Sequence, residues 1–224
     1  MLLSPRLRTS LRRASFAPLL AILWVMAALG WSYRAYGSPP MPVLERVQGD
    51  VTLIRSGNPI SPTRGVVVMR RDRLLTGPHS RAAVLFPDGS RLLLGANAEF
   101  ILDDLMPPDG RQRAALRIDV PHGAFRLIMA EPNDLRRGPE RQVLVRTARA
   151  SVMLNTGDLW AGPLEDSTGV LAIYGKMQVR NDAGSLVLDR KRQGTLIKPS
   201  AGLGEPTVWP RHRVEQALMQ SVFD

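Results

Sequence analysis

Gly77–Leu94, which reads GPHSRAAVLFPDGSRLLL, is the stretch that decides the fold of this chain. Apolar residues recur on both sides of its centre and alternate with other residues at the period of a pleated sheet: Ala83, Leu85, Leu92 and Leu94. Asp88-Gly89 lies between the two runs and is a strong hairpin signal, because Asp tolerates a positive φ and Gly adopts one without steric cost. The stretch therefore predicts two strands joined by a tight turn.

Three other segments share one pattern of Gly, any residue, apolar, polar, apolar: Gly49–Leu53, Gly123–Leu127 and Gly175–Val179. The pattern predicts a strand that is entered through a glycine at a bend or bulge and that buries alternate side chains. Their irregular spacing excludes a solenoid of fixed period. We expect similar strand pairs that stack across a sandwich or a wound β fold.

Turn signals separate these runs: Ser56–Pro59, Pro107–Gly110 and Asn181–Gly184. Aromatic residues make up only 5% of the chain, whereas it holds 19 Gly and 18 Pro, which is typical of a turn-rich β protein. Two polar or glycine-rich stretches predict surface loops: Glu131–Arg141 and Gly162–Gly169. The fold class predicted is all-β, an antiparallel sandwich or jelly-roll-like domain.

The central stretch, preceded by Arg71–Gly77, resembles the core signature of the FecR-type domain. Further segments resemble other strands of that family, so that the resemblance covers about residues 43–198: Val47–Leu53, Val120–Leu127, Val143–Thr147, Ile173–Val179 and Val187–Gly194. Two departures stand out. Arg70-Arg71-Asp72 lacks the glycine that the family usually carries before its Asp, and Val152–Trp160 replaces a frequent V-R-G-T-x-F segment. The resemblance implies an exported domain that takes part in signalling at the cell envelope.

The N-terminal segment has the layout of an export signal. Four basic residues come first, Arg6, Arg8, Arg12 and Arg13. An apolar run from Phe16 to Trp31 follows them. Small residues before Ser38 offer a cleavage position after Gly37. The run is short for a membrane span, which needs about 20 residues, so a cleaved signal and an uncleaved anchor both stay open. Either predicts that residues 38–224 lie outside the cytoplasm, in the periplasm.

These patterns divide the chain into four parts. Residues 1–37 form the signal peptide or membrane-anchor helix, residues 38–43 a stiff Pro-rich linker, residues 44–200 the FecR-like β domain, and residues 201–224 a C-terminal extension. Helical spacing of apolar residues predicts a short helix from about Arg211 to Ser221. This helix either caps an open end of the β core or docks on a partner or a membrane face.

The sequence predicts a protein that is not an enzyme. The chain holds no Cys and three isolated histidines, His79, His122 and His212, and Asp103-Asp104 is typical of a solvated strand end. We therefore assign no catalytic, cofactor-binding or metal-binding residue and expect no cofactor; a hydrolase or lyase on this fold has no support in the pattern. FecR-type proteins that transmit iron signals handle a sigma factor with a cytoplasmic portion. Only residues 1–15 precede the apolar run here, which predicts that this portion is missing.

The partner expected is another protein of the cell envelope, bound by a non-catalytic interaction or signalling module. The formal net charge of +10 also suits an anionic polymer, so a carbohydrate- or peptidoglycan-binding module is the alternative. In that alternative, an exposed Trp160 or Trp209 would stack on a sugar ring. No nucleic-acid-binding motif is present, and the protein is membrane-tethered if its signal stays uncleaved.

Overall fold

The computed structural model describes residues 41–106, 115–130, 142–199 and 202–223, all of which belong to one compact unit, Pro40–Asp224. The predicted export segment and most of the linker, at residues 1–40, lie outside the described residues. So do the predicted turn at 107–110 and the predicted loop at 131–141. Among the described residues, no helix combines the length and apolar character needed to cross a membrane.

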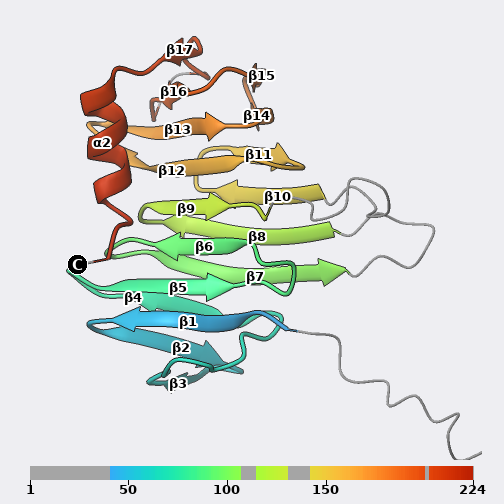
Figure 1. The fold of residues 1–224 in the computed structure, drawn as a ribbon, viewed down its shortest axis with the longest axis vertical. Helices are drawn as coiled ribbons and strands as arrows, with labels where there is room; N and C mark the ends of the chain where they lie inside the picture. Colours follow the sequence, from blue (N-terminus) through green and yellow to red (C-terminus); the bar gives the residue numbers. More distant parts are fainter. Residues whose placement is uncertain (1–40, 107–114, 131–141, 200–201, 224) are drawn as a thin grey trace, which may run out of the picture. The chain divides into compact units, whose positions relative to one another are not determined.

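The described strands form two sheets (Figure 1). The eight-stranded sheet has the order β1 (Val43–Gln48), β5 (Arg81–Leu85), β6 (Arg91–Leu94), β9 (Phe125–Ile128), β12 (Asp158–Leu164), β13 (Ser167–Tyr174), β16 (Gln193–Ile197) and β17 (Thr207–Val208). The nine-stranded sheet has the order β15 (Gly184–Leu188), β14 (Met177–Asn181), β11 (Ser151–Leu154), β10 (Gln142–Thr147), β8 (Ala115–His122), β7 (Glu99–Met106), β4 (Arg73–Thr76), β2 (Val51–Arg55) and β3 (Asn58–Ile60). The all-β prediction is confirmed.

One strand pair departs from the antiparallel pairing that the sequence predicts. β8 and β10 lie side by side in parallel, with Leu116 opposite Val143 and Ile118 opposite Val145. The chain leaves β8 for β9 in the other sheet before it returns to β10. A detour through the second sheet lets the chain re-enter the first sheet in the same direction, which a short hairpin cannot do.

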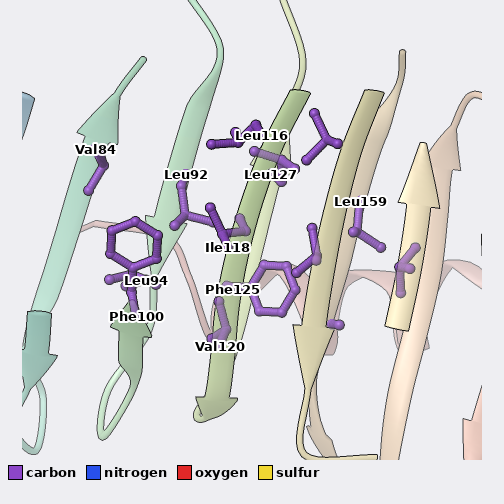
Figure 2. Close-up of a cluster of buried hydrophobic side chains, with 14 of the residues drawn as sticks. Val84, Leu92, Leu94, Phe100, Leu116, Ile118, Val120, Phe125, Leu127 and Leu159 are labelled. Atoms are coloured by element: carbon purple, nitrogen blue, oxygen red, sulfur yellow. The ribbon is translucent and has the colours of Figure 1, made fainter. Parts of the chain in front are cut away.

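A single apolar core fills the space between the two sheets (Figure 2). Both sheets contribute fully buried side chains to it: Val84, Leu92, Leu127 and Leu159 from one sheet, and Phe100, Leu116, Ile118 and Val145 from the other. The strands alternate buried and more exposed residues, as in β8, because each sheet turns one face to the core. This joint core identifies the fold as a β sandwich.

The recurring glycines mark places where the chain passes from one sheet to the other. Gly49 connects β1 to β2, Gly123 connects β8 to β9, and Gly175 connects β13 to β14; each has a positive φ, at 76°, 78° and 95° respectively. The strand that follows each glycine buries alternate residues: Val51 and Leu53, Phe125 and Leu127, Met177 and Val179. The prediction of strands entered through a glycine bend is confirmed.

The predicted central hairpin forms as β5 and β6, with a different register from that of a two-residue turn. Pro87, Asp88 and Gly89 make a three-residue turn in which only Gly89 has a positive φ, of 87°. The turn closes where the Phe86 N–H donates to the Ser90 oxygen at 2.8 Å. The extra residue places Val84 rather than Leu85 opposite Leu92, so Ala82 and Val84 face the inter-sheet core and Ala83 and Leu85 face outward.

The prediction of a surface loop at Gly162–Gly169 is wrong. β12 and β13 run through most of this segment, and a tight turn at Glu165-Asp166 joins them. Glu165 adopts a positive φ of 54° at this turn. Both strand positions need a glycine because a side chain would clash there: a Cβ on Gly162 would lie 2.6 Å from the Ala124 Cβ, and a Cβ on Gly169 would lie 3.0 Å from the Trp160 ring.

The predicted C-terminal helix is confirmed as α2 (Arg211–Met219), which Figure 1 shows crossing the strands. It packs on the outer face of the eight-stranded sheet, so the prediction that it caps an open end of the core is corrected. Val214 and Ala217 of α2 belong to a second buried cluster that is separate from the inter-sheet core. The residues after α2 continue across this sheet, where the Arg81 guanidinium donates to the Val222 oxygen at 3.2 Å and Arg46 lies 4.4 Å from the Phe223 ring centre.

Candidate interaction surface

The polar residues of the central FecR-like stretch have structural partners. Asp72 is 2% exposed and accepts hydrogen bonds from the Arg55 side chain at 2.6 Å and from the Met69 N–H at 2.8 Å. The Thr76 hydroxyl donates to the Gly95 oxygen at 2.7 Å. Because buried polar groups must be hydrogen-bonded, these side chains hold the turns of the fold. The stretch is a folding motif, and a binding surface must be sought elsewhere.

Two serines of the same stretch also hold turns through hydrogen bonds. Ser80 accepts a hydrogen bond from the Asp50 N–H at 2.8 Å, beside the corner at Gly49. Ser90 donates to Asp88 at 2.7 Å and accepts from the Ala130 N–H at 3.0 Å. Both serines are at most 1% exposed. Ser90 is therefore a turn residue, in agreement with the absence of a nucleophile motif around it.

The three histidines are far from forming an acid–base site. His79 and His122 lie at exposed turns or strand ends, and His212 lies on the exposed side of α2. A hollow of about 210 Å³ is lined by His122, Arg149 and Thr147, and its lining includes no carboxylate. Within the described residues, no group of three or more His, Asp or Glu side chains could hold a metal ion.

Asp103 and Asp104 lie at a bulge in β7, where the pairing with β8 shifts register. Each carboxylate faces an arginine: Asp103 accepts from Arg146 at 2.8 Å, and Asp104 lies 3.8 Å from Arg70. Arg146 also pairs with Asp119 at 2.6 Å, and the hydrogen bond to Asp119 is the main cause that raises the pKa of the Arg146 guanidinium. Asp103 and Asp104 are therefore held in ion pairs with arginines.

Trp160 and Trp209 are buried, at 0% and 1% exposure, so neither is available to stack on a sugar ring as the glycan-binding alternative requires. Their rings meet edge to face at 6.3 Å beneath α2. Gly194 makes room for Trp209, because a Cβ there would lie 2.5 Å from the ring. The departure segment that ends at Trp160 thus supplies the second core. A hollow of about 370 Å³ beside Trp209 is lined by Lys198, Glu205 and Arg213 among others.

The outer edge of β15 is the longest strand edge that the described part of the chain leaves unpaired, and we call it the β15 edge (Gly184–Leu188). Four exposed basic residues lie on the adjoining turns and form what we call the basic turns: Lys176 before β14, and Arg190, Lys191 and Arg192 after β15. Within the described residues, none of these four side chains forms an ion pair. This surface was not predicted from the sequence, although the run Arg190-Lys191-Arg192 indicates a basic turn.

Two crystal structures resemble the sandwich, and each is described as that of a candidate anti-sigma factor from Parabacteroides distasonis ATCC 8503. The TM-scores are 0.52 and 0.50, the sequence identity is 13% in both cases, and each match covers 65% of this chain. The matches cover 64% and 63% of the neighbours, which is less than two thirds of either chain. At this identity the likeness shows a shared fold alone. No protein-family model and no curated protein matches the chain.

Proposed function

We propose that residues 38–224 act outside the cytoplasm as a FecR-like, non-catalytic interaction or signalling module of the cell envelope. The observation that carries the proposal is the placement of the FecR-like segments in the structure. Val47–Leu53, Val120–Leu127, Val143–Thr147 and Ile173–Val179 all fall on strands or corners of one sandwich. The similar folds belong to candidate anti-sigma factors, which are regulatory proteins, and this supports a role in signalling.

Three observations support an interaction surface for this module. Asp72 and Thr76 of its FecR-like stretch are used in turns, its histidines are dispersed, and Asp104 and Asp119 on the outer face pair with arginines. The partner proposed is another envelope protein. The glycan-binding alternative loses its main structural support, because both candidate stacking residues, Trp160 and Trp209, are buried.

The location is tested with β-lactamase fused after Asp224 of the full chain. Because this enzyme protects cells from ampicillin only outside the cytoplasm, we expect resistant cells. The matched control is the same fusion without residues 1–37, which should leave the cells sensitive. A full-length fusion that is stable but gives no resistance would overturn the proposed location.

The partner class is tested by in-cell crosslinking of the tagged full-length protein, followed by mass spectrometry. We expect an outer-membrane receptor or a transmembrane regulator among the crosslinked proteins. If wall fragments or wall-synthesis enzymes were recovered instead, with no regulator, the glycan-binding alternative would replace the signalling module.

A further inference from the structure

The backbone of β15 offers hydrogen-bonding groups that its own sheet does not use. β14 and β15 are joined by a two-residue turn, and Asn181 and Gly184 form the pair that closes it. Hydrogen bonding alternates along an antiparallel pair, so Gly184, Leu186 and Leu188 turn their N–H and C=O groups toward β14. The backbone groups of Ser185 and Val187 therefore point to the open edge.

The other three sheet edges are short or protected. β3 is three residues long and contains Pro59, which cannot donate to an added strand, and β17 has only two residues. The segment beside β1 already covers the start of that strand, since the Leu44 N–H donates to the Val66 oxygen at 2.9 Å and the Val68 N–H donates to the Pro42 oxygen at 2.8 Å.

Within the described residues, the β15 edge carries none of these protections, and only the turn before it has a neighbour, Gly202 beside Ala183. Its sequence, GSLVL, has no proline and no charged residue, and the Val187 side chain is 42% exposed. Uncharged strands at an open edge are templates for pairing with another chain, and natural proteins usually block them. An edge left open in this way points to an added strand as its occupant.

The charges beside the edge decide what kind of strand fits. Arg190, Lys191 and Arg192 follow β15 after Asp189, and Lys176 lies on the turn before its neighbour β14. The four basic residues outnumber the two acidic residues at the ends of β15, Asp182 and Asp189, so the surroundings of the edge carry a net positive charge. A second copy would bring the same net positive charge to the edge, whereas a strand with acidic side chains would complement it.

We propose that the β15 edge binds an extended segment of a partner protein as an additional strand, with acidic residues of that segment placed against the basic turns. Backbone hydrogen bonds to Ser185 and Val187 hold the strand, and Arg190, Lys191 and Arg192 select for acidic residues at one end. The inference rests on the proposed function only in that the partner is a protein.

The probe is a synthetic peptide that alternates Thr and Val and begins with a run of Asp and Glu. Amide hydrogen exchange of the full chain, followed by NMR, is measured with and without the peptide. We expect slower exchange of the Ser185 and Val187 amides, and little change at Leu186, whose N–H is already bonded to β14. A peptide with Lys in place of the acidic run should bind about tenfold more weakly, because like charges at an interface oppose association.

Two variants separate strand pairing from simple charge attraction. Val187→Pro removes an outward N–H without removing a bond to β14, and we expect about tenfold weaker peptide binding. Arg190→Glu leaves the strand intact and should weaken binding of the acidic peptide by about tenfold as well. The matched control is Arg64→Glu, an equal charge change on an exposed residue beside β1, which should leave binding unchanged.

Several results would overturn the inference. One is unchanged exchange at Ser185 and Val187 with saturating peptide, and another is equal binding by the Lys peptide. Equal binding of polyglutamate or of an anionic polysaccharide to the protein and to Val187→Pro would show charge attraction alone. A dimer whose β15 amides are protected without peptide would identify a second copy as the occupant. Failure of export would overturn the proposed function and leave these results unaffected.

Discussion

Arg126 on β9 and Asp158 on β12 form a bidentate ion pair on the outer face of the eight-stranded sheet. The Nε–Oδ1 distance is 2.9 Å, and a terminal guanidinium nitrogen lies 2.6 Å from Oδ2. The side chain of Asp158 is 4% exposed and that of Arg126 is 25% exposed. The hydrogen bonds to Asp158 favour the charged guanidinium and raise the pKa of Arg126.

Arg126→Met should lower the free energy of unfolding by about 3–5 kcal/mol, because it leaves the buried Asp158 carboxylate without its cation. The double variant Arg126→Met/Asp158→Leu should recover most of this loss. Urea denaturation measures both changes. The control is Arg91→Met, whose pair with Glu45 is at the surface, with 30% of the Glu45 side chain exposed; it should change stability by less than about 1 kcal/mol. An equal loss in the two single variants would contradict the argument.

Arg71→Gly should stabilise the protein by about 1 kcal/mol. Arg71 has a φ of 67°, which costs an L-residue with a Cβ about 1–2 kcal/mol and costs glycine almost nothing. This is the position where the FecR-type pattern that the stretch resembles usually has a glycine. Thermal unfolding measures the effect. Arg70→Gly, one residue earlier and without a positive φ, should lower the melting temperature instead.

Gly194→Ala should destabilise the protein by about 1–3 kcal/mol and loosen the contact between α2 and its sheet. The new methyl group would overlap Trp209, whose ring lies 2.5 Å from the position of a Cβ. The readouts are urea denaturation and tryptophan emission. The emission maximum should move to longer wavelength as the Trp209 ring becomes more exposed to water. Gly57→Ala is the control: no atom lies within 4 Å, so only its positive φ matters and the emission should stay the same. Unchanged emission in Gly194→Ala would argue against tight packing of Trp209.

Thr76→Val should lower stability by about 2 kcal/mol although it preserves the shape of the side chain. The Thr76 hydroxyl donates to the Gly95 oxygen at 2.7 Å and accepts from the Ala98 N–H at 2.8 Å, and valine leaves both groups buried and unpaired. Chemical denaturation measures the loss. Thr52→Val, on the half-buried outer side of β2, should stay within about 0.5 kcal/mol of the parent.

Local patterns predicted most strands and the bends between them. The Gly49, Gly123 and Gly175 segments, the central hairpin and α2 were predictable because each depends on residues close together in the sequence. The register of the hairpin was not predictable, because the extra turn residue Pro87 places Val84, rather than Leu85, opposite Leu92. The parallel pairing of β8 with β10 also escaped prediction, because it depends on where a chain returns after it has visited the other sheet.

The candidate surface was less predictable than the fold. Burial of Trp160 and Trp209 depends on Gly162, Gly169 and Gly194, which lie on three different strands and meet the rings only in the folded sheet. The same glycines made part of β12 and β13 look like a loop. That β15 ends its sheet follows from the order of all nine strands, which no local pattern contains.

The residues that cover the outer face of the eight-stranded sheet come last among the described residues. Trp160 on β12 packs against Trp209 and against Ala217 on α2, and the final described residues contact Arg46 and Arg81 near the start of the sandwich. In a chain synthesised from its N-terminus, this outer apolar cluster stays open to water until Trp209 and α2 have been made. The strands of the inter-sheet core precede α2 in the sequence, so the outer face of this sheet is closed later than that core can form.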